Sequence, residues 1–438
     1  MIPPAESETL DRDRLTAHQI DRLADLLRQI YGPNAFYTRK LDEAGVDIAT
    51  LRLPADLTRL PLTTKAELVA DQAAAPPWGT ARTYPLDRYT RYCQTSGTTG
   101  APLRWTDTPD NWQWLLDCWK AVYRAARVGR GDRAVFPFSF GPFLGFWAGF
   151  EAGSQLGVHV VPCGGMSSEQ RVTLIVTVGA TVVCCTPTYA LRLAEVAAET
   201  RPDDPLARSS VRVVIVAGEP GGSIPTTRRR IEEAWGARVL DHHGLTEVGP
   251  TSFECWEAPG GLHLNEREFI CEVLDPHSGR HVDDGVRGEL VVTNLGRIGS
   301  PVIRYRTGDL VVRRTGPCAC GRTFARLEGG VLGRADDMVN IRGVNVFPSA
   351  VEDLVMGFPE IAEFRAIVSH RDALASLTLE VEVVESHTVD DHQRTLASRV
   401  SGRLRDAFGL NIPVKVVAPH TLPRFEVKAR RFIDELQE

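Results

Sequence analysis

The stretch Thr95-Ser96-Gly97-Thr98-Thr99-Gly100 combines residue types that bind phosphate groups through backbone and hydroxyl donors. Its two glycines allow a tight turn that brings backbone N–H groups close to an anion, and its four hydroxyls add further donors. The stretch lacks the Gly-Lys-Ser/Thr ending of a Walker loop, which argues against a P-loop NTPase. Taken alone, the same composition also fits a solvated turn, so its interpretation depends on the rest of the chain.

A second group of residues has the types of metal ligands. Cys318 and Cys320 are separated by one residue, and Cys255 and His263 precede them. Three cysteines and one histidine would fill a tetrahedral structural zinc site that has no open position for water. The alternative is that these are separate free thiols. The remaining cysteines lie in apolar contexts and are expected to be buried packing residues: Cys93, Cys118, Cys163, Cys184, Cys185 and Cys271.

Composition limits the class of protein. A chain of 438 residues exceeds what one hydrophobic core usually serves, so two domains are expected. The net charge of −6 argues against a nucleic-acid or anionic-membrane partner held by bulk charge. No apolar run is long enough to cross a bilayer, and the first residues lack the features of a signal peptide. The nine scattered cysteines suit a reducing cytoplasm, which is the predicted location.

The elements that would position the candidate residues alternate between helices and strands. Helices are predicted over Thr16–Tyr31, Thr63–Asp71 and Ile224–Trp235, the last with Ser223 as its N-cap and Gly236 at its end. Short β-branched runs predict strands at Val158–Val161, Thr181–Cys185, Val211–Val216 and Arg238–Leu240. This order predicts an α/β fold with a mainly parallel sheet.

Two polar loops follow predicted strands of this sheet, Ala217–Gly222 and His243–Glu247. Ligands in parallel sheets usually bind beyond the carboxyl ends of the strands, so both loops are candidate ligand-binding segments.

After Gly330 the pattern changes to that of a small α+β unit. Helices are predicted over Ser349–Met356 and His387–Phe408, and strands at Phe364–Val368, Leu377–Val384 and Val414–Val417. The chain is therefore predicted to have a large N-terminal domain, residues 1–335, and a small mobile C-terminal domain, residues 336–438. The connector between them is Gly333-Arg334-Ala335-Asp336-Asp337.

The order of the motifs resembles that of the adenylate-forming superfamily of acyl-CoA synthetases and adenylation domains. After the Thr95 loop the chain carries, in sequence, His243-Gly244-Leu245-Thr246-Glu247, Tyr305-Arg306-Thr307-Gly308-Asp309-Leu310, Gly333–Asp337 and Leu422-Pro423-Arg424-Phe425-Glu426-Val427-Lys428. Within the superfamily the chain is most similar to the phenylacetate–CoA ligase branch, because of Leu60–Leu68 and Val344-Asn345-Val346-Phe347-Pro348. The resemblance covers nearly the whole chain.

The resemblance implies roles for individual residues in the attack of a carboxylate on the α-phosphate of ATP. Thr95, Ser96, Gly97, Thr98, Thr99 and Gly100 would cradle the β- and γ-phosphates, and Glu247, next to Thr246, would hold Mg²⁺. Asp309 would accept the ribose hydroxyls, Gly218, Glu219 and Pro220 would line the adenine, and Arg334 would lie near ribose or phosphate. Lys428 on the small domain would act in adenylation. Without the motif context, Asp309 would be a turn aspartate, Arg334 a surface ion pair and Lys428 a solvated lysine.

Three positions depart from the family pattern. His243, before Gly244, stands where relatives usually have a tyrosine that contacts adenine or the α-phosphate. Val427 replaces the glycine that commonly precedes the C-terminal lysine, and Leu103-Arg104-Trp105 lacks a lysine that is frequent in relatives. None of these changes removes a charge that the reaction needs. The related ligases often carry a Cys/His cluster, which favours zinc at Cys255, His263, Cys318 and Cys320.

The acyl substrate is expected against the aromatic stretch 136–147, because the matching loop of phenylacetate–CoA ligases lines the aryl pocket. Phe138, Phe140, Phe143 and Phe146 could stack on a flat ring, and Gly141 and Gly145 leave room for it. The alternative is that most of these aromatic residues belong to the core. No charged residue lies between Val135 and Phe150, which indicates a neutral aryl body. Polar ring substituents could meet Ser139, Thr186, Thr188 or Tyr189.

The predicted function is therefore ATP-dependent activation of an aromatic carboxylic acid, followed by transfer of the acyl group to CoA or to the phosphopantetheine of a carrier protein. One alternative is adenylation of another oxyanion, such as nitrite, with capture by an aryl amine. Another is a nucleotide-binding regulatory protein without catalysis, against which Glu247, Asp309, Arg334 and Lys428 together argue. ATP, Mg²⁺ and structural Zn²⁺ are the expected cofactors. A homodimer is possible, since dimers are common among relatives.

Overall fold

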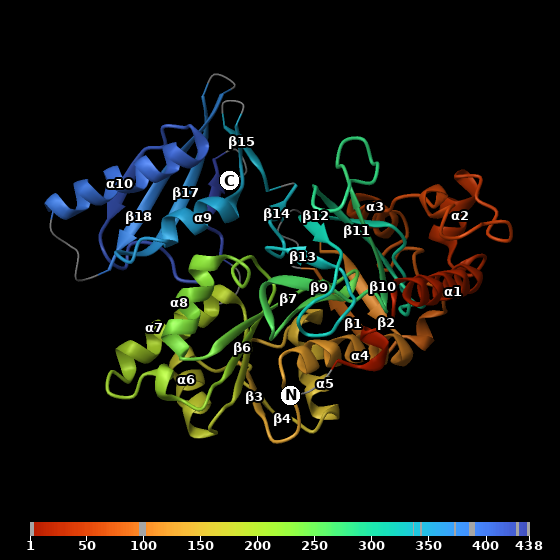
Figure 1. The fold of residues 1–438 in the computed structure, drawn as a ribbon, viewed down its shortest axis with the longest axis horizontal. Coiled ribbons are helices and arrows are strands. Elements are labelled where there is room, and N and C mark those ends of the chain that lie inside the picture. Colours follow the sequence, from red (N-terminus) through yellow and green to blue (C-terminus); the bar gives the residue numbers. More distant parts are fainter. Residues whose placement is uncertain are drawn as a thin grey trace.

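The computed structural model describes residues 4–95, 102–335, 337–341, 344–371, 374–384, 390–425 and 429–435. A large lobe contains the N-terminal three quarters of the chain, and a smaller lobe, blue in Figure 1, lies above helices α7 and α8 of the large one. The fold is a mixed α/β fold with a large N-terminal sheet domain and a smaller C-terminal α+β domain, as the sequence predicts.

Three helices near the N-terminus pack beside the large sheet: α1 (Arg12–Ile30), α2 (Ala35–Glu43) and α3 (Lys65–Ala74). The Asp11 carboxylate caps α1 by accepting the Arg14 N–H, and Thr64 and Glu67 form a reciprocal capping box at α3. The helices predicted over Thr16–Tyr31 and Thr63–Asp71 are thus present with shifted ends.

One half of the large sheet is parallel. Its strands lie in the order β4 (His159–Pro162), β3 (Arg133–Phe136), β5 (Val182–Cys185), β6 (Val213–Val216) and β7 (Arg238–Leu245). Helices α4 (Pro109–Ala125) and α5 (Leu144–Gln155) share one hydrophobic cluster with the sheet, and α6 (Ser168–Thr177), α7 (Pro187–Thr200) and α8 (Pro225–Trp235) share another. The two clusters cover opposite faces, since Leu240 belongs to the first and Val239 to the second.

The other half of the same sheet is antiparallel, which the sequence analysis did not anticipate. After β7 the order continues through β8 (Gly249–Cys255), β9 (Ala258–Leu264), β13 (Arg326–Glu328), β12 (Tyr305–Arg314), β11 (Arg287–Asn294) and β10 (Phe269–Leu274), and β14 (Gly333–Arg334) pairs with β12. A separate hairpin of β1 (Arg91–Gln94) and β2 (Arg104–Asp107) precedes α4.

The small lobe has its own core. Its sheet has the order β19 (Val414–Val417), β18 (Leu374–Val383), β17 (Ile361–Arg371) and β20 (Phe432–Asp434), and it packs with α9 (Pro348–Met356) and α10 (Asp390–Phe408). A short hairpin of β15 (Val339–Ile341) and β16 (Val344–Val346) joins this core. The strands and helices predicted after Gly330 are present, most with shifted ends, and the helix predicted from His387 is described from Asp390 onward.

One predicted cap is wrong. The N-cap position of α8 is Ile224 and has no side-chain cap, while the Ser223 hydroxyl donates instead to Asp241. The predicted end of this helix is confirmed: Gly236 has φ +58°, and a Cβ there would lie 2.6 Å from the carbonyl oxygen of Ala207.

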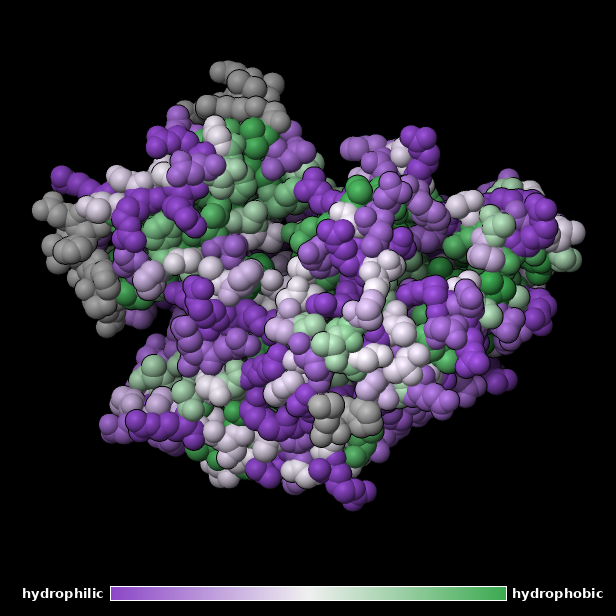
Figure 2. Space-filling view, viewed as in Figure 1, coloured by the Kyte–Doolittle hydropathy of each residue, from purple (hydrophilic) through white to green (hydrophobic). Residues whose placement is uncertain are grey.

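The face shown in Figure 2 is largely hydrophilic, with hydrophobic residues gathered on the small lobe. None of the described helices combines the length and the apolar composition that crossing a membrane requires.

Candidate active site

The predicted phosphate loop connects β1 and β2. Thr95 is buried, its N–H donates to the Leu103 carbonyl (3.0 Å), and its Oγ1 accepts the Leu103 N–H (3.0 Å). Ser96, Gly97, Thr98, Thr99 and Gly100 lie outside the described residues. The Gln94 N–H donates to the Pro142 carbonyl (2.7 Å), so the hairpin contacts the loop of the aromatic stretch.

His243, Asp309 and Arg334 meet where β7, β12 and β14 approach one another. Nε2 of His243 lies 3.0 Å from Oδ2 of Asp309, and Nη1 of Arg334 lies 3.4 Å from Oδ1. The carboxylate of Asp309 is buried, and its partners are a residue from each neighbouring motif. The structure therefore brings together three residues that the sequence analysis assigned to nucleotide binding. Gly244 follows on β7, where a Cβ would lie 2.7 Å from the Gly249 carbonyl oxygen.

Glu247 is also buried, although it ends a polar loop. The Tyr305 hydroxyl donates to Oε1 of Glu247 (3.2 Å), and burial raises the pKa of Tyr305, so the phenol keeps its proton. The Thr246 carbonyl accepts a hydrogen bond from Nη1 of Arg297 (2.7 Å). These contacts fix the position of the Thr246–Glu247 pair.

Arg297 and Asp107 support this region and were missed in the sequence. Both side chains are fully buried, with Nε of Arg297 2.7 Å from Oδ1 of Asp107 and Nη2 2.6 Å from Oδ2. Because Asp107 ends β2, this ion pair joins the hairpin of the Thr95 loop to Thr246. The partners are 190 positions apart in the chain, and no local pattern indicates the pair.

The loop after β6 contains Gly218, Glu219 and Pro220. Gly218 is exposed with φ +95°, and a Cβ on Gly222 would lie 2.5 Å from Cγ of Asp241. Glu219 accepts hydrogen bonds from the backbone N–H groups of Thr188 and Ala429. The loop thus lies at the carboxyl edge of the parallel strands, against the small lobe.

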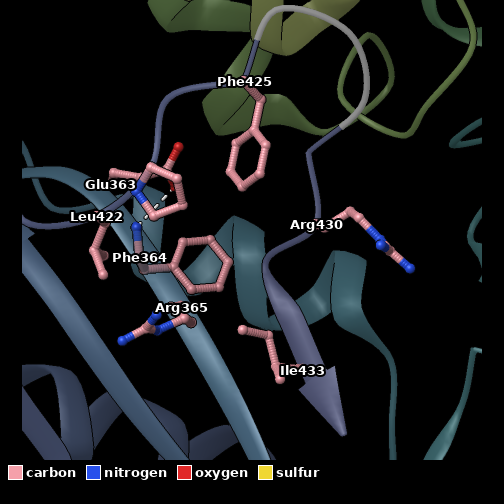
Figure 3. Close-up of a pocket in the computed structure, with 8 residues that line it drawn as sticks. Glu363, Phe364, Arg365, Leu422, Phe425, Arg430 and Ile433 are labelled. Atoms are coloured by element: carbon pink, nitrogen blue, oxygen red, sulfur yellow. Dashed lines mark hydrogen bonds between the residues drawn. The ribbon is translucent and has the colours of Figure 1, made fainter. Parts of the chain in front are cut away.

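Lys428 lies outside the described residues, which end at Phe425 and resume at Ala429. Arg424 pairs with Glu382 of the small lobe and, at 3.4 Å, with Glu195 of α7. Figure 3 shows Phe425 above Phe364 of β17, and Arg430 on the chain that leads into β20. They line a pocket of the small lobe together with Glu363, Phe364, Arg365, Leu422, Pro423 and Ile433.

The predicted aryl-binding residues divide into two groups. Phe138 and Phe140 stack on each other, with ring centroids 4.3 Å apart, and Phe138 also contacts Phe146 (5.2 Å). Phe143 is 42% exposed and has no ring partner among the described residues. Gly141 packs against the Phe143 ring, because a Cβ on this residue would lie 3.0 Å from the ring. The Gly141 carbonyl accepts a hydrogen bond from Nε1 of Trp147 (3.1 Å).

His242 extends the aromatic group and was not singled out in the sequence. Its ring lies 4.5 Å from that of Trp119, which in turn contacts Phe146 (6.1 Å). Burial lowers the pKa of His242 to about 4, so the ring is neutral at pH 7. Its Nδ1 donates to the Ser252 carbonyl (2.8 Å), which leaves Nε2 as an acceptor.

The four predicted metal ligands are gathered in one place. The ligand atoms of Cys255, His263, Cys318 and Cys320 all lie within 4.8 Å of one another. The sulfurs of Cys255 and Cys318 are 3.7 Å apart, close to the ~3.8 Å edge of a tetrahedron with Zn–S bonds of about 2.3 Å. Nδ1 of His263 donates to the Phe324 carbonyl (3.2 Å), so the lone pair of Nε2 is directed into the cluster, where Nε2 lies 3.4 Å from the Cys320 sulfur. The donor set and its geometry fit zinc.

Comparisons with known proteins agree with this site. Residues 46–296 match the AMP-binding enzyme family, and residues 343–436 match the AMP-binding enzyme C-terminal domain. The phenylacetate-coenzyme A ligase of Thermus thermophilus is 35% identical over 99% of both chains. The Escherichia coli phenylacetate-coenzyme A ligase is 33% identical over 98% of this chain and 96% of the relative.

Solved structures give the same result. A 2-hydroxyisobutyryl-CoA ligase in the postadenylation state superposes with a TM-score of 0.94 at 29% identity, over 99% of this chain and 94% of the other. The same ligase in the thioesterification state, covering 99% and 93%, gives a TM-score of 0.74. The arrangement of the lobes here is thus more similar to the postadenylation state.

The chain belongs to the family of adenylate-forming, AMP-binding enzymes. Within it, the chain falls in the phenylacetate–CoA ligase-like branch of AMP-forming CoA ligases.

Proposed function

We propose that this protein activates an aromatic carboxylic acid with ATP, forming an acyl-adenylate and pyrophosphate, and then transfers the acyl group to CoA with release of AMP. The observation that carries the proposal is the meeting of His243, Asp309 and Arg334 beside the buried Glu247, at the carboxyl edge of a parallel sheet. Ligands of such sheets bind at this edge. The full-length relatives named as phenylacetate-coenzyme A ligases support the reaction class.

Nucleotide binding is assigned to three parts of this edge. Asp309 accepts the ribose hydroxyls, with its two oxygens held by His243 and Arg334. The backbone of Gly218, Glu219 and Pro220 lines the adenine. The loop that begins at Thr95 receives the phosphates, whose negative charge its backbone and hydroxyl donors would offset.

Glu247 is the proposed Mg²⁺ ligand, because a carboxylate is the kind of hard oxygen donor that this ion prefers. When bound, Mg²⁺ would offset the charge of the leaving pyrophosphate. Tyr305 and Arg297 contribute by holding Glu247 and the Thr246 backbone in place. Lys428 supplies a positive charge to the attacking carboxylate and the α-phosphate.

The acyl group is placed against Phe138, Phe140 and Phe146, with His242 and Trp119 on the same face of the sheet. The described part of this wall is apolar apart from the acceptor nitrogen of His242, which suits an uncharged ring. The apolar wall is the reason for proposing an acid with an uncharged aromatic ring and no charged group other than its carboxylate.

The Cys255, His263, Cys318 and Cys320 cluster is proposed to hold a structural zinc ion. It contributes four protein ligands, and these leave no position for substrate. The zinc would tie β8 and β9 to the segment between β12 and β13.

Two assays test the proposal: hydroxylamine trapping of the acyl-adenylate, and a comparison of CoA with a carrier protein as the acyl acceptor. The protein is incubated with ATP, Mg²⁺ and an aromatic acid, and hydroxylamine traps the adenylate as a hydroxamate. In a parallel reaction without hydroxylamine, added CoA should convert the adenylate to acyl-CoA with release of AMP. Conversion only with a phosphopantetheinylated carrier protein would correct the acceptor, and a hydroxamate signal independent of the acid would contradict the proposal.

A further inference from the structure

Glu219 connects the two lobes through its two carboxylate oxygens. Oε1 accepts the backbone N–H of Thr188 (2.9 Å), and Oε2 accepts the backbone N–H of Ala429 (2.7 Å). Thr188 is the second residue of α7 in the large lobe, and Ala429 belongs to the chain of the small lobe. One side chain therefore spans the boundary between the lobes by hydrogen bonds to backbone on each side.

The large-lobe end of this bridge is favourable for a carboxylate. The first N–H groups of a helix have no partner within the helix, and the helix dipole is positive at this end. Glu219 satisfies one of these groups in α7, while the Thr186 side chain accepts the Tyr189 N–H of the same turn. The large lobe therefore holds the Glu219 carboxylate in a defined position through its own hydrogen bond.

The chain that follows Ala429 in the small lobe is also held in place by ion pairs. Two residues after Ala429, the guanidinium of Arg431 is buried, and it pairs with Glu363 (2.7 Å) and Glu352 (3.3 Å). Glu352 in turn accepts from the Thr227 hydroxyl of α8 (3.1 Å). Although burial lowers the pKa of Arg431, the charges of Glu352 and Glu363 raise it above its usual value, and the charge of Glu219 adds to this effect.

Ala429 directly follows Lys428, the residue assigned to adenylation. We propose that Glu219 is a positioning residue for adenylation, which holds the backbone at Ala429 against the N-terminus of α7 and so fixes the chain directly after Lys428. This rests on the proposed function. In this proposal the Glu219 carboxylate acts at the boundary between the lobes, and its neighbours Gly218 and Pro220 contact the adenine.

The bridge should act in one half-reaction only. The lobe arrangement is more similar to the postadenylation state of the related ligase than to its thioesterification state. The hydrogen bond to Ala429 belongs to the first arrangement, and moving the small lobe would break it. Glu219 should thus influence adenylation and leave thioester formation unchanged.

The test compares Glu219→Gln with Glu199→Gln, which makes the same change at an exposed position of α7 whose carboxylate lies 3.6 Å from Nη1 of Arg192 on the same helix. A glutamine offers one acceptor oxygen for two N–H groups, so one hydrogen bond is lost. Acid-dependent ATP–pyrophosphate exchange should fall by on the order of 10-fold or more in Glu219→Gln, the scale of a misplaced catalytic group. The KM for ATP and thioester formation from a synthetic acyl-adenylate should stay at wild-type values, and Glu199→Gln should match wild type throughout.

Two further measurements separate this role from others. In a Lys428→Ala background, Glu219→Gln should cause no additional loss, because it acts through Lys428. Amide hydrogen exchange at Ala429 should become faster in Glu219→Gln, a readout that needs no substrate.

A raised KM for ATP with unchanged exchange rate would overturn the proposal in favour of an adenine contact. Equal loss in both half-reactions, or an additional loss in the Lys428→Ala background, would overturn it as well. If the wild-type protein exchanged pyrophosphate with no acid, the proposed function would fail, and protection of the Ala429 amide by Glu219 would still be decided by hydrogen exchange.

Discussion

Nε2 of His243 lies 3.0 Å from Oδ2 of Asp309, so the histidine of the His243–Glu247 motif contacts the carboxylate that is proposed to bind the ribose. On its other side, Nδ1 of His243 lies 3.4 Å from the Ser252 hydroxyl. Because the serine can donate to Nδ1, the ring can donate its Nε2 proton to Asp309. His243 therefore orients the carboxylate that is proposed to bind the ribose.

Changing Asp309 should weaken ATP binding. Asp309→Asn replaces one acceptor oxygen and removes the charge, and a hydrogen bond to a charged group contributes about 1.5–3 kcal/mol. The KM for ATP should rise by on the order of 10-fold or more. His243→Phe keeps a ring and loses the contacts to Asp309 and Ser252, but the Asp309 carboxylate remains, so the KM for ATP should rise less. A larger effect from His243→Phe than from Asp309→Asn would contradict this order of roles.

Lys428→Ala should abolish most of the first half-reaction while ATP still binds. Losing one positioned charge at a transition state costs on the order of 10²-fold in rate, and acid-dependent pyrophosphate exchange should fall by that amount or more. Lys415→Ala removes a lysine of the same lobe that pairs with Glu380 (3.0 Å), and it should leave exchange unchanged. Wild-type exchange in Lys428→Ala would refute the assignment.

Purified protein should contain one zinc ion per chain. Cys320→Ser removes one ligand of the cluster and should lower both the zinc content and the Tm. Cys271→Ser, a cysteine outside the cluster, should keep the zinc. Elemental analysis and thermal unfolding measure both quantities. Wild-type protein without stoichiometric zinc would end the proposal.

His242 should make the protein less stable in mild acid. Its pKa is about 4 in the folded protein and about 6.5 when unfolded, so the unfolded chain binds more protons between these values. Stability is therefore lost as the pH falls through this range, by about 2 kcal/mol between pH 7 and pH 5. Urea unfolding at both pH values should show a smaller loss for His242→Gln than for wild type or for His159→Gln, an exposed control on β4. An equal loss in all three proteins would show that His242 does not carry this effect.

The motifs with fixed local spacing were predictable from the sequence, because each combines glycines and polar residues next to a β-branched run. His243, Asp309 and Arg334 could be proposed together only through the resemblance, and the structure brings them into contact. The Cys/His cluster was found from its residue types, and its geometry agrees.

Contacts between distant segments could not be predicted in this way. The buried pair of Arg297 and Asp107 and the bridge from Glu219 to Ala429 join segments 190 and 210 positions apart. Ser223 has the residue type of an N-cap, but the half-buried Asp241 carboxylate is a stronger acceptor and takes its hydroxyl. Phe143 matched the aromatic pattern of its neighbours, and its exposure depends on the course of the loop.

Acid-dependent ATP–pyrophosphate exchange across a panel of acids tests the central claim most directly. The panel contains benzoic, phenylacetic, cinnamic and aminobenzoic acids, with 2-hydroxyisobutyric acid as an aliphatic comparison. We predict Mg²⁺-dependent exchange with at least one aromatic acid, formation of AMP, and weaker exchange with the aliphatic acid. Exchange with the aliphatic acid alone, or ADP and phosphate as the products, would contradict it.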